Sequence, residues 1–110
     1  MEKLSKVSAS QINKSLNVIE AFRRIDSNMP ISQVAFFLNA AKNEGLSLTD
    51  LADMSGILLA NASRYIVTLS NGKVGEKGLD LLDYYENPVN RRQKLVVLTE
   101  KGRKLIAQLS

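Results

Sequence analysis

Residues 51–69 read LADMSGILLANASRYIVTL, and they carry the pattern of two short helices joined by a glycine turn. The turn is Met54-Ser55-Gly56, and the second helix runs from about Leu59 to Leu69. Apolar side chains recur at helical spacing on one face of this second helix, namely Ala62, Tyr65, Ile66 and Leu69. Ser47 or Thr49 can cap the first helix. The sequence therefore predicts a helix-turn-helix over about residues 47–70.

Two further helices are predicted upstream of this motif. Residues 8–27 place apolar side chains at steps of three and four, namely Ile12, Leu16, Ile19, Phe22 and Ile25. Asn28-Met29-Pro30 ends this helix, because proline has no N–H and disfavours helical geometry in the residue before it. A second helix follows within residues 31–45, where Gly45 is typical of a left-handed C-terminal cap.

Downstream, the pattern changes from helical to extended. The glycine-rich segment NGKVGEKG, residues 71–78, is expected to form a loop. Two β-prone runs, residues 79–86 and 92–98, flank a turn at residues 87–90 and predict a hairpin, the wing, over about residues 79–98. Thr99 is expected to cap a last helix.

Composition narrows the fold and the class of function. The 110 residues, 45% hydrophobic, suit a single domain that is mainly α with a small β-hairpin. We divide the chain into an N-terminal helix, residues 1–29, as a possible dimerisation element, and a winged helix-turn-helix domain, residues 30–110. Fifteen Lys and Arg against eleven Asp and Glu give a charge of +4, a mild bias towards polyanions.

Several classes of chemistry lack their usual residues. The chain has no Cys and no His, so disulfides, thiolate metal sites and histidine bases are excluded. Carboxylate pairs such as Asp50 with Asp53 are better explained as cap, turn or surface residues than as catalytic groups. We expect no enzyme, no cofactor and no metal site. Because no apolar run approaches the length of about 18 residues that a membrane span needs and no leader segment stands at the start, we expect a cytoplasmic protein.

Over about residues 30–105 the sequence resembles the MarR-type winged-helix transcription regulators. The first resembling stretch is LADMSGILLANASRYIVTL, and the second is NPVNRRQKLVVLTEKGRKL, residues 87–105, which is similar to the wing and to the L-T-x-x-G-R-x-L run that opens the next helix. The two stretches stand in the family's order and spacing, which makes accidental similarity improbable. The resemblance implies a winged helix-turn-helix that binds double-stranded DNA through the helix beginning at Leu59.

The resemblance also assigns candidate DNA-binding residues. Asn61 can pair with adenine, Arg64 with guanine or a phosphate, and Ser63 and Thr68 suit either role, although all of them also suit a solvated helix surface. In the wing, strand alternation predicts that only one of Arg91 and Arg92 faces the nucleic acid, and Arg91 is favoured. The full set of candidates is Ser47, Thr49, Leu59, Ala60, Asn61, Ser63, Arg64, Thr68, Asn90, Arg91, Arg92 and Lys94.

The sequence departs from the family pattern in four places. Residues 57–60 are apolar where the family is polar, so they either touch thymine methyl groups or mark a protein-binding face. Asn90 replaces an acidic residue before the paired arginines, and NGKVG is an insertion after the recognition helix. The sequence stops at Ser110, before the family's long C-terminal dimerisation helices.

The short C-terminus bears on assembly and on function. We expect a homodimer formed through residues 8–27, aided by Leu105, Ile106 and Leu109, although these apolar stripes equally suit the domain's own core. Because the family's ligand pocket depends on the missing region, no small-molecule effector is assigned. The expected function is sequence-specific, repressor-like transcription regulation. The alternatives are a winged-helix protein–protein interaction module and a phage or plasmid replication or partition protein with the same fold.

Overall fold

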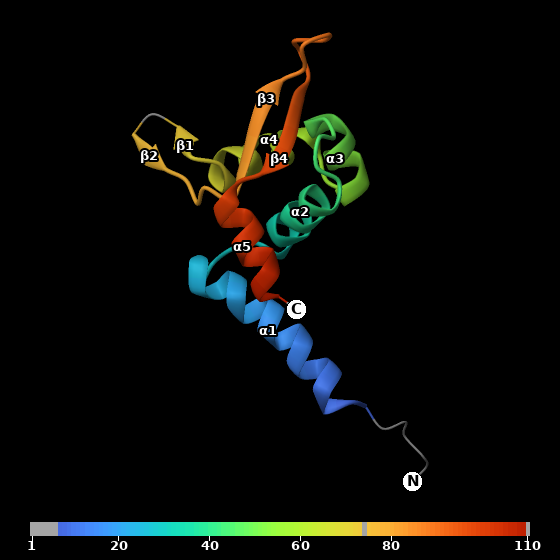
Figure 1. Cartoon of the computed structure of the whole chain (residues 1–110), viewed down its shortest axis with the longest axis vertical. Coiled ribbons are helices and arrows are strands. Elements are labelled where there is room, and N and C mark those ends of the chain that lie inside the picture. Colours follow the sequence, from blue (N-terminus) through green and yellow to red (C-terminus); the bar gives the residue numbers. More distant parts are fainter. Residues whose placement is uncertain (1–6, 74, 110) are drawn as a thin grey trace.

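The computed structural model describes residues 7–73 and 75–109, within which five helices and two hairpins follow one another (Figure 1). The helices are α1 (Ala9–Ile25), α2 (Ile31–Lys42), α3 (Leu48–Ser55), α4 (Leu59–Leu69) and α5 (Glu100–Gln108). The strands are β1 (Gly72–Lys73), β2 (Glu76–Lys77), β3 (Leu82–Glu86) and β4 (Lys94–Leu98). This order confirms the predicted winged helix-turn-helix.

Side-chain caps fix the start of three helices. Ser8, Ser47 and Thr99 accept hydrogen bonds from the backbone N–H three residues later, in α1, α3 and α5 respectively. The predicted caps at Ser47 and Thr99 are confirmed. Gly56 ends α3 in the left-handed conformation, with φ of 69°, and gives the helix-turn-helix its turn. Gly45 is also left-handed, but α2 already ends at Lys42 with Asn43 as its cap.

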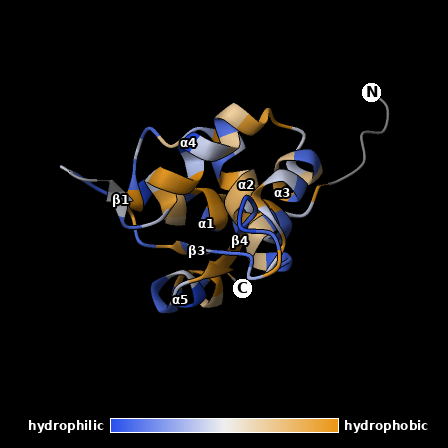
Figure 2. Ribbon diagram, turned by 90° about the horizontal axis from the view of Figure 1, so that it is seen from above, coloured by the Kyte–Doolittle hydropathy of each residue, from blue (hydrophilic) through white to orange (hydrophobic). Residues whose placement is uncertain are grey.

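The core is built from the inward faces of the helices and of the wing strands. Phe22 and Phe37 meet edge to face with ring centroids 5.7 Å apart, so the C-terminal half of α1 packs on α2. Figure 2 shows hydrophobic parts of α1, α2 and the strands near the centre of the view. The large, fully buried side chains come from α1 to α4 and from the wing: Phe22, Phe36, Phe37, Leu51, Ile66, Leu69, Leu81, Leu82 and Val96.

The wing is an antiparallel pair in which Leu82 lies opposite Leu98 and Glu86 opposite Lys94. Residues 45–47 extend this pair, because Gly45 N–H donates to the Val96 carbonyl at 2.7 Å and Val96 N–H donates to the Leu46 carbonyl at 3.0 Å. The predicted wing over residues 79–98 is thus joined directly to the segment that enters α3. The base of the wing and the helix-turn-helix form one unit.

Residues 71–78 differ from the expected loop. They form a short second hairpin in which β1 pairs with β2, so the loop prediction was wrong. Gly72 and Gly75 both have φ of 86°, and a Cβ at Gly72 would stand 2.2 Å from the Glu76 carbonyl oxygen. The backbone then runs back along the end of α4, where Leu79 N–H donates to the Thr68 carbonyl and Leu81 N–H to the Leu69 carbonyl.

A carboxylate clasp joins the end of α2 to β4 and α5. Glu44 accepts a hydrogen bond from Leu98 N–H at 3.0 Å, and Arg103 donates to both of its carboxylate oxygens, at 3.0 and 2.7 Å. The hydrogen bond from Leu98 N–H has the larger effect and that from the Arg103 guanidinium the smaller, and both hold the pKa of Glu44 below its usual value. The clasp therefore ties α5 to the base of the wing.

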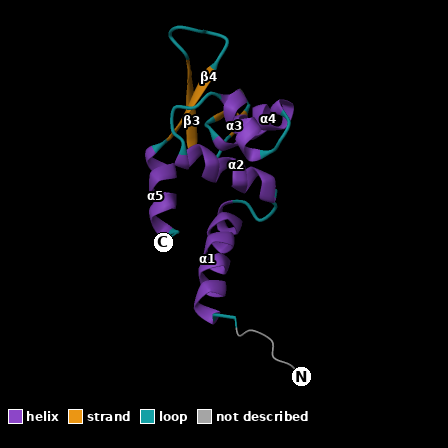
Figure 3. Ribbon diagram, turned by 90° about the vertical axis from the view of Figure 1, so that its right-hand side faces the viewer, coloured by secondary structure: helices purple, strands orange, loops and turns teal. Residues whose placement is uncertain are grey.

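The wing and α1 lie at opposite ends of the molecule (Figures 1 and 3). The buried part of α1 includes Ala21 and Phe22, whereas Ile12, Leu16 and Ile19 are exposed. The apolar stripe of the first helix is therefore divided: its C-terminal half closes the core and its N-terminal half faces outward. Leu105 is buried, and Ile106 and Leu109 pack against the core, so the apolar face of α5 serves the domain itself.

Candidate nucleic-acid interface

The helix α4 is held by one face and presents the other. Ala62, Ile66 and Leu69 are buried against the core. The Tyr65 hydroxyl lies 2.6 Å from the Ser32 hydroxyl on α2, and the Tyr65 ring contacts Phe36. These contacts fix the rotation of α4 about its axis. Its other face is therefore set by helical geometry to point away from the core.

The outward face of α4 carries most of the predicted recognition residues. Ser63, Arg64, Thr68 and the smaller Ala60 are exposed, and Asn61 is half-buried. Arg64 donates a hydrogen bond through its guanidinium to the Asn61 side-chain oxygen. Asn61 and Arg64 are three residues apart and so are neighbours on the helix surface. An amide and a guanidinium side by side offer paired donors and acceptors to base edges.

The two hydroxyl residues at the start of α3, Ser47 and Thr49, differ in exposure. Ser47 is only 5% exposed, and its side chain caps the helix by accepting from Asp50 N–H at 3.1 Å. Capping thus accounts for the position of Ser47. Thr49 is exposed, so it is the hydroxyl of this pair that lies at the surface.

The wing residues lie in a turn and not in a strand. Asn90, Arg91 and Arg92 fall between β3 and β4, so the argument that strand alternation sends the two arginines to opposite faces was wrong. The turn is braced from within: the Asn90 side chain accepts from Arg92 N–H at 3.2 Å, and the Asn87 side chain donates to Gln93 at 2.9 Å. Both arginine side chains are exposed.

Lys94 begins β4 and is also exposed, with its ammonium group 5.4 Å from the centroid of the Tyr84 ring. This distance is typical of a cation–π contact. The lysine is therefore held over the wing strands.

A hollow of about 180 Å³ lies between the helix-turn-helix and the wing. Leu59 and Ser63 from α4, Thr49 from α3, and Arg92 and Lys94 from the wing line it, together with Leu48 and Gln93. Five predicted site residues therefore meet at one place. Asn90 and Arg91 do not line this hollow, so of the two arginines it is Arg92 that borders the helix.

A second hollow, of about 330 Å³, lies further along the same helix. It is lined by Ser63, Arg64, Val67 and Thr68 from α4 and by Glu76 from β2. Sequence reasoning missed the place of Glu76, because residues 71–78 were expected to be a loop. It also left Gln93 and Leu58 out of the candidate residues, although the apolar stretch that contains Leu58 was noticed.

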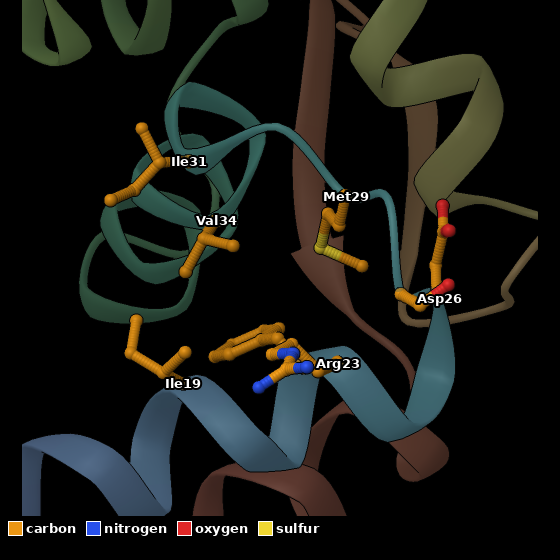
Figure 4. Close-up of a pocket in the computed structure, with 8 residues that line it drawn as sticks. Ile19, Arg23, Asp26, Met29, Ile31 and Val34 are labelled. Carbon is orange, nitrogen blue, oxygen red and sulfur yellow. The ribbon is translucent and has the colours of Figure 1, made fainter.

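The largely apolar hollow between α1 and α2 is a separate feature, of about 240 Å³ (Figure 4). Figure 4 shows Ile19 on α1 opposite Val34 on α2, with Met29 from the connecting loop and Arg23 beside them. This hollow shares no lining residue with the two beside α4.

Two further observations concern the described part of the chain. Among residues 7–73 and 75–109, no group of three Asp or Glu side chains is placed to hold a metal ion. No helix in the same ranges has the length and apolar character needed to cross a membrane.

Comparison with solved structures identifies the fold. No protein-family model matches the chain, and no curated protein is similar to it in sequence. A MarR transcriptional regulator from Methanosarcina mazei superposes with a TM-score of 0.68 at 19% identity, over 90% of this chain and 65% of that one. RV1404 from Mycobacterium tuberculosis gives 0.67 at 22% identity, over 98% and 75%.

A third similar structure concerns the regulation of DNA binding of Bordetella bronchiseptica BpsR by 6-hydroxynicotinic acid. It gives a TM-score of 0.62 at 22% identity, over 91% of this chain and 72% of BpsR. The chain thus has the winged-helix fold of MarR regulators and spans between about two thirds and three quarters of the length of these three proteins.

Proposed function

We propose that this chain is a sequence-specific double-stranded DNA-binding protein that regulates transcription, with α4 in the major groove and the wing beside it on the DNA backbone. One observation carries the proposal: the outward face of α4 and the basic residues Arg92 and Lys94 border the same hollow. A duplex lying across that hollow meets polar groups suited to bases and cations suited to phosphates. The DNA binding named for BpsR, which has the same fold, supports DNA as the ligand.

The base contacts are assigned to the exposed side of α4. Asn61 offers a bidentate pair to adenine, and Arg64 offers one to guanine. In the free chain these two side chains share one hydrogen bond, and binding exchanges that bond for contacts with bases. Each bidentate contact discriminates against a wrong base by about 1–3 kcal/mol. Ser63 and Thr68, exposed on the same helix, are assigned supporting contacts.

The backbone contacts are assigned to the wing and to α3. Arg92 and Lys94 border the hollow, Arg91 and Asn90 stand further along the turn, and Thr49 lies at the start of α3. Arg92 is preferred over Arg91 because it is the arginine next to α4. A cation that neutralises a phosphate releases counterions, so these residues govern affinity for every sequence alike.

The proposed active form is a homodimer joined through α1. Ile12, Leu16 and Ile19 recur at steps of four and three and remain exposed, Leu16 by 50%, so they form an unpartnered apolar stripe. Ile19 also lines the hollow between α1 and α2, which extends this stripe towards α2 (Figure 4). A two-fold axis at α1 leaves the wing of each protomer away from the interface, so that each protomer can meet one half-site.

The DNA-binding proposal is tested by selecting bound duplexes from a random library and repeating the selection with single variants. Arg64→Ala is expected to lose preference at one base position. Arg92→Ala is expected to weaken binding to all sequences and to reduce the slope of log K against log salt by about 0.9 per half-site. Arg24→Ala, an exposed arginine on α1, is the matched control.

The outcomes separate this function from the alternatives. A wild-type protein that binds no duplex in low-salt buffer contradicts the proposal. If a protein partner then binds α4 with little dependence on salt, the chain is instead a protein–protein interaction module.

The dimer is tested by sedimentation of two charge-adding variants of α1. Leu16→Lys is expected to give a monomer, because it places a charge in the proposed interface. Asn17→Lys, at an exposed polar position next to it, is expected to remain a dimer. Equal masses for the two variants would rule out the stripe as the interface.

A further inference from the structure

The start of α4 carries an apolar side chain where a polar one is usual. Leu58 is the N-cap residue, and it makes no side-chain hydrogen bond to the helix. Its side chain is 72% exposed. Leucine at an N-cap is less favourable than Ser, Thr, Asp or Asn, all of which satisfy a free backbone N–H. Exposure and a missing cap together mean that the Leu58 side chain contributes little to the fold, whereas its backbone carbonyl accepts from Asn61 and Ala62 N–H at the start of α4.

The position of Leu58 relates it to the proposed DNA-reading residues. Leu58 and Asn61 are three residues apart, and so are Asn61 and Arg64, so the three follow one line along the helix. With a rise of 1.5 Å per residue, this line is about 9 Å long, which corresponds to roughly three base pairs. Ile57 packs against the core and so anchors the backbone directly before Leu58. Leu58 therefore directly precedes α4, at the end of the row that continues to Asn61 and Arg64.

We infer that Leu58 is a specificity residue that contacts the C5-methyl group of thymine in the major groove. This inference rests on the proposed function and refines it. Thymine is the one base that presents a methyl group in that groove, and an apolar side chain is its matching contact. Because Asn61 is the next residue in the row and suits adenine, the two neighbours favour A·T pairs at the end of the site that meets the start of α4.

Two features favour thymine over a protein as the occupant. Leu58 is continuous with the row that holds Asn61 and Arg64, so a partner covering it must also accept a guanidinium and an amide. Arg92 and Lys94 border the neighbouring hollow, which makes the surroundings basic and suits a polyanion.

The test compares thymine with deoxyuridine, which lacks only the methyl group. The duplex selected by the wild-type protein is remade with deoxyuridine at one thymine at a time, and dissociation constants are measured for the wild-type protein and for Leu58→Ala. At one thymine per half-site, the wild-type protein is expected to bind about fourfold more weakly, the effect of losing one buried methyl-sized contact. Leu58→Ala is expected to bind the thymine duplex about as weakly and to show no further loss with deoxyuridine.

A DNA control and two further Leu58 variants separate failure of this inference from failure of the proposed function. Deoxyuridine outside the selected site is the DNA control, and Leu58→Met, which keeps an apolar side chain, is expected to restore most of the preference. Leu58→Ser adds a cap and so provides a well-folded variant that lacks the apolar contact. Sequence-specific binding that ignores deoxyuridine everywhere, or a deoxyuridine effect that persists in Leu58→Ala, overturns the inference alone. A wild-type protein that binds no duplex overturns the proposed function with it.

Discussion

Replacing Gly102 by alanine should destabilise the domain, although the position lies inside a helix. In an ordinary helix interior, glycine to alanine stabilises by about 1 kcal/mol. Here a Cβ would stand 2.1 Å from the Leu81 carbonyl oxygen and 3.1 Å from a methyl carbon of Leu98. An ordinary contact begins at 3.4 Å, so α5 and the start of the wing must separate by about 1.3 Å.

The separation is costly because the same carbonyl is already engaged. Leu81 accepts from Thr99 N–H at 3.1 Å, and the Thr99 hydroxyl donates to the Asp80 carbonyl at 2.7 Å. A shift of this size breaks or stretches both bonds, at about 1 kcal/mol each. Overpacking adds about 1–3 kcal/mol. After subtraction of the helix preference of alanine, the net loss in the free energy of unfolding is about 2–4 kcal/mol, or about 8–16 °C in Tm.

Thermal and urea unfolding followed by circular dichroism measure this loss. Lys101→Ala, at the exposed neighbouring position, is the control and should change stability by less than about 0.5 kcal/mol. If Gly102→Ala is as stable as the wild-type protein or more so, then α5 does not approach the wing as closely as described, and the physical reason given for this glycine fails.

Three other substitutions test separate parts of the structure. Glu44→Gln should lower the free energy of unfolding by about 1 kcal/mol near pH 7. Because the pKa of Glu44 is lower in the folded chain, this difference from the wild-type protein should persist above the unfolded pKa, about 4.3, and disappear as the pH falls through the folded pKa. Urea unfolding at a series of pH values measures it. Ser47→Ala should lower stability by about 1 kcal/mol in chemical unfolding while leaving the dissociation constant for DNA unchanged, and a large loss of DNA affinity would instead indicate a phosphate contact. Tyr65→Phe should cost about 1 kcal/mol, and a double-mutant cycle with Ser32→Ala should show that the two effects are not additive.

Local signals in the sequence predicted the helices and two of the caps well. Apolar spacing is a property of the segment itself, so α1, α2 and α4 could be placed from residues 8–69 alone. Ser47 and Thr99 were predictable for the same reason, because a cap depends on the three residues that follow it. The wing was predictable because two β-prone runs flank a turn-forming segment.

What failed depended on contacts between distant segments or on very short elements. Strands of two residues carry no alternation of apolar and polar side chains, so the hairpin at residues 71–78 resembled a loop. The alternation argument for Arg91 and Arg92 assumed a strand where the chain still turns. Whether the stripe on α1 faces the core or the outside was decided at Phe22 by its packing on Phe37, which no local pattern shows.

The geometry of α4 explains why its fold and its proposed specificity can vary separately. Ala62 and Ile66 bind the helix to the core, whereas Asn61 and Arg64 lie on the outward side and contact each other. Because side chains at steps of three and four stay on their own face, a change in the outward row alters what is bound without loosening what is packed. Leu58 fits this division: at its exposed position an apolar side chain weakens the helix start slightly, so a reason for its presence is to be sought in what α4 binds and not in what holds α4 in place.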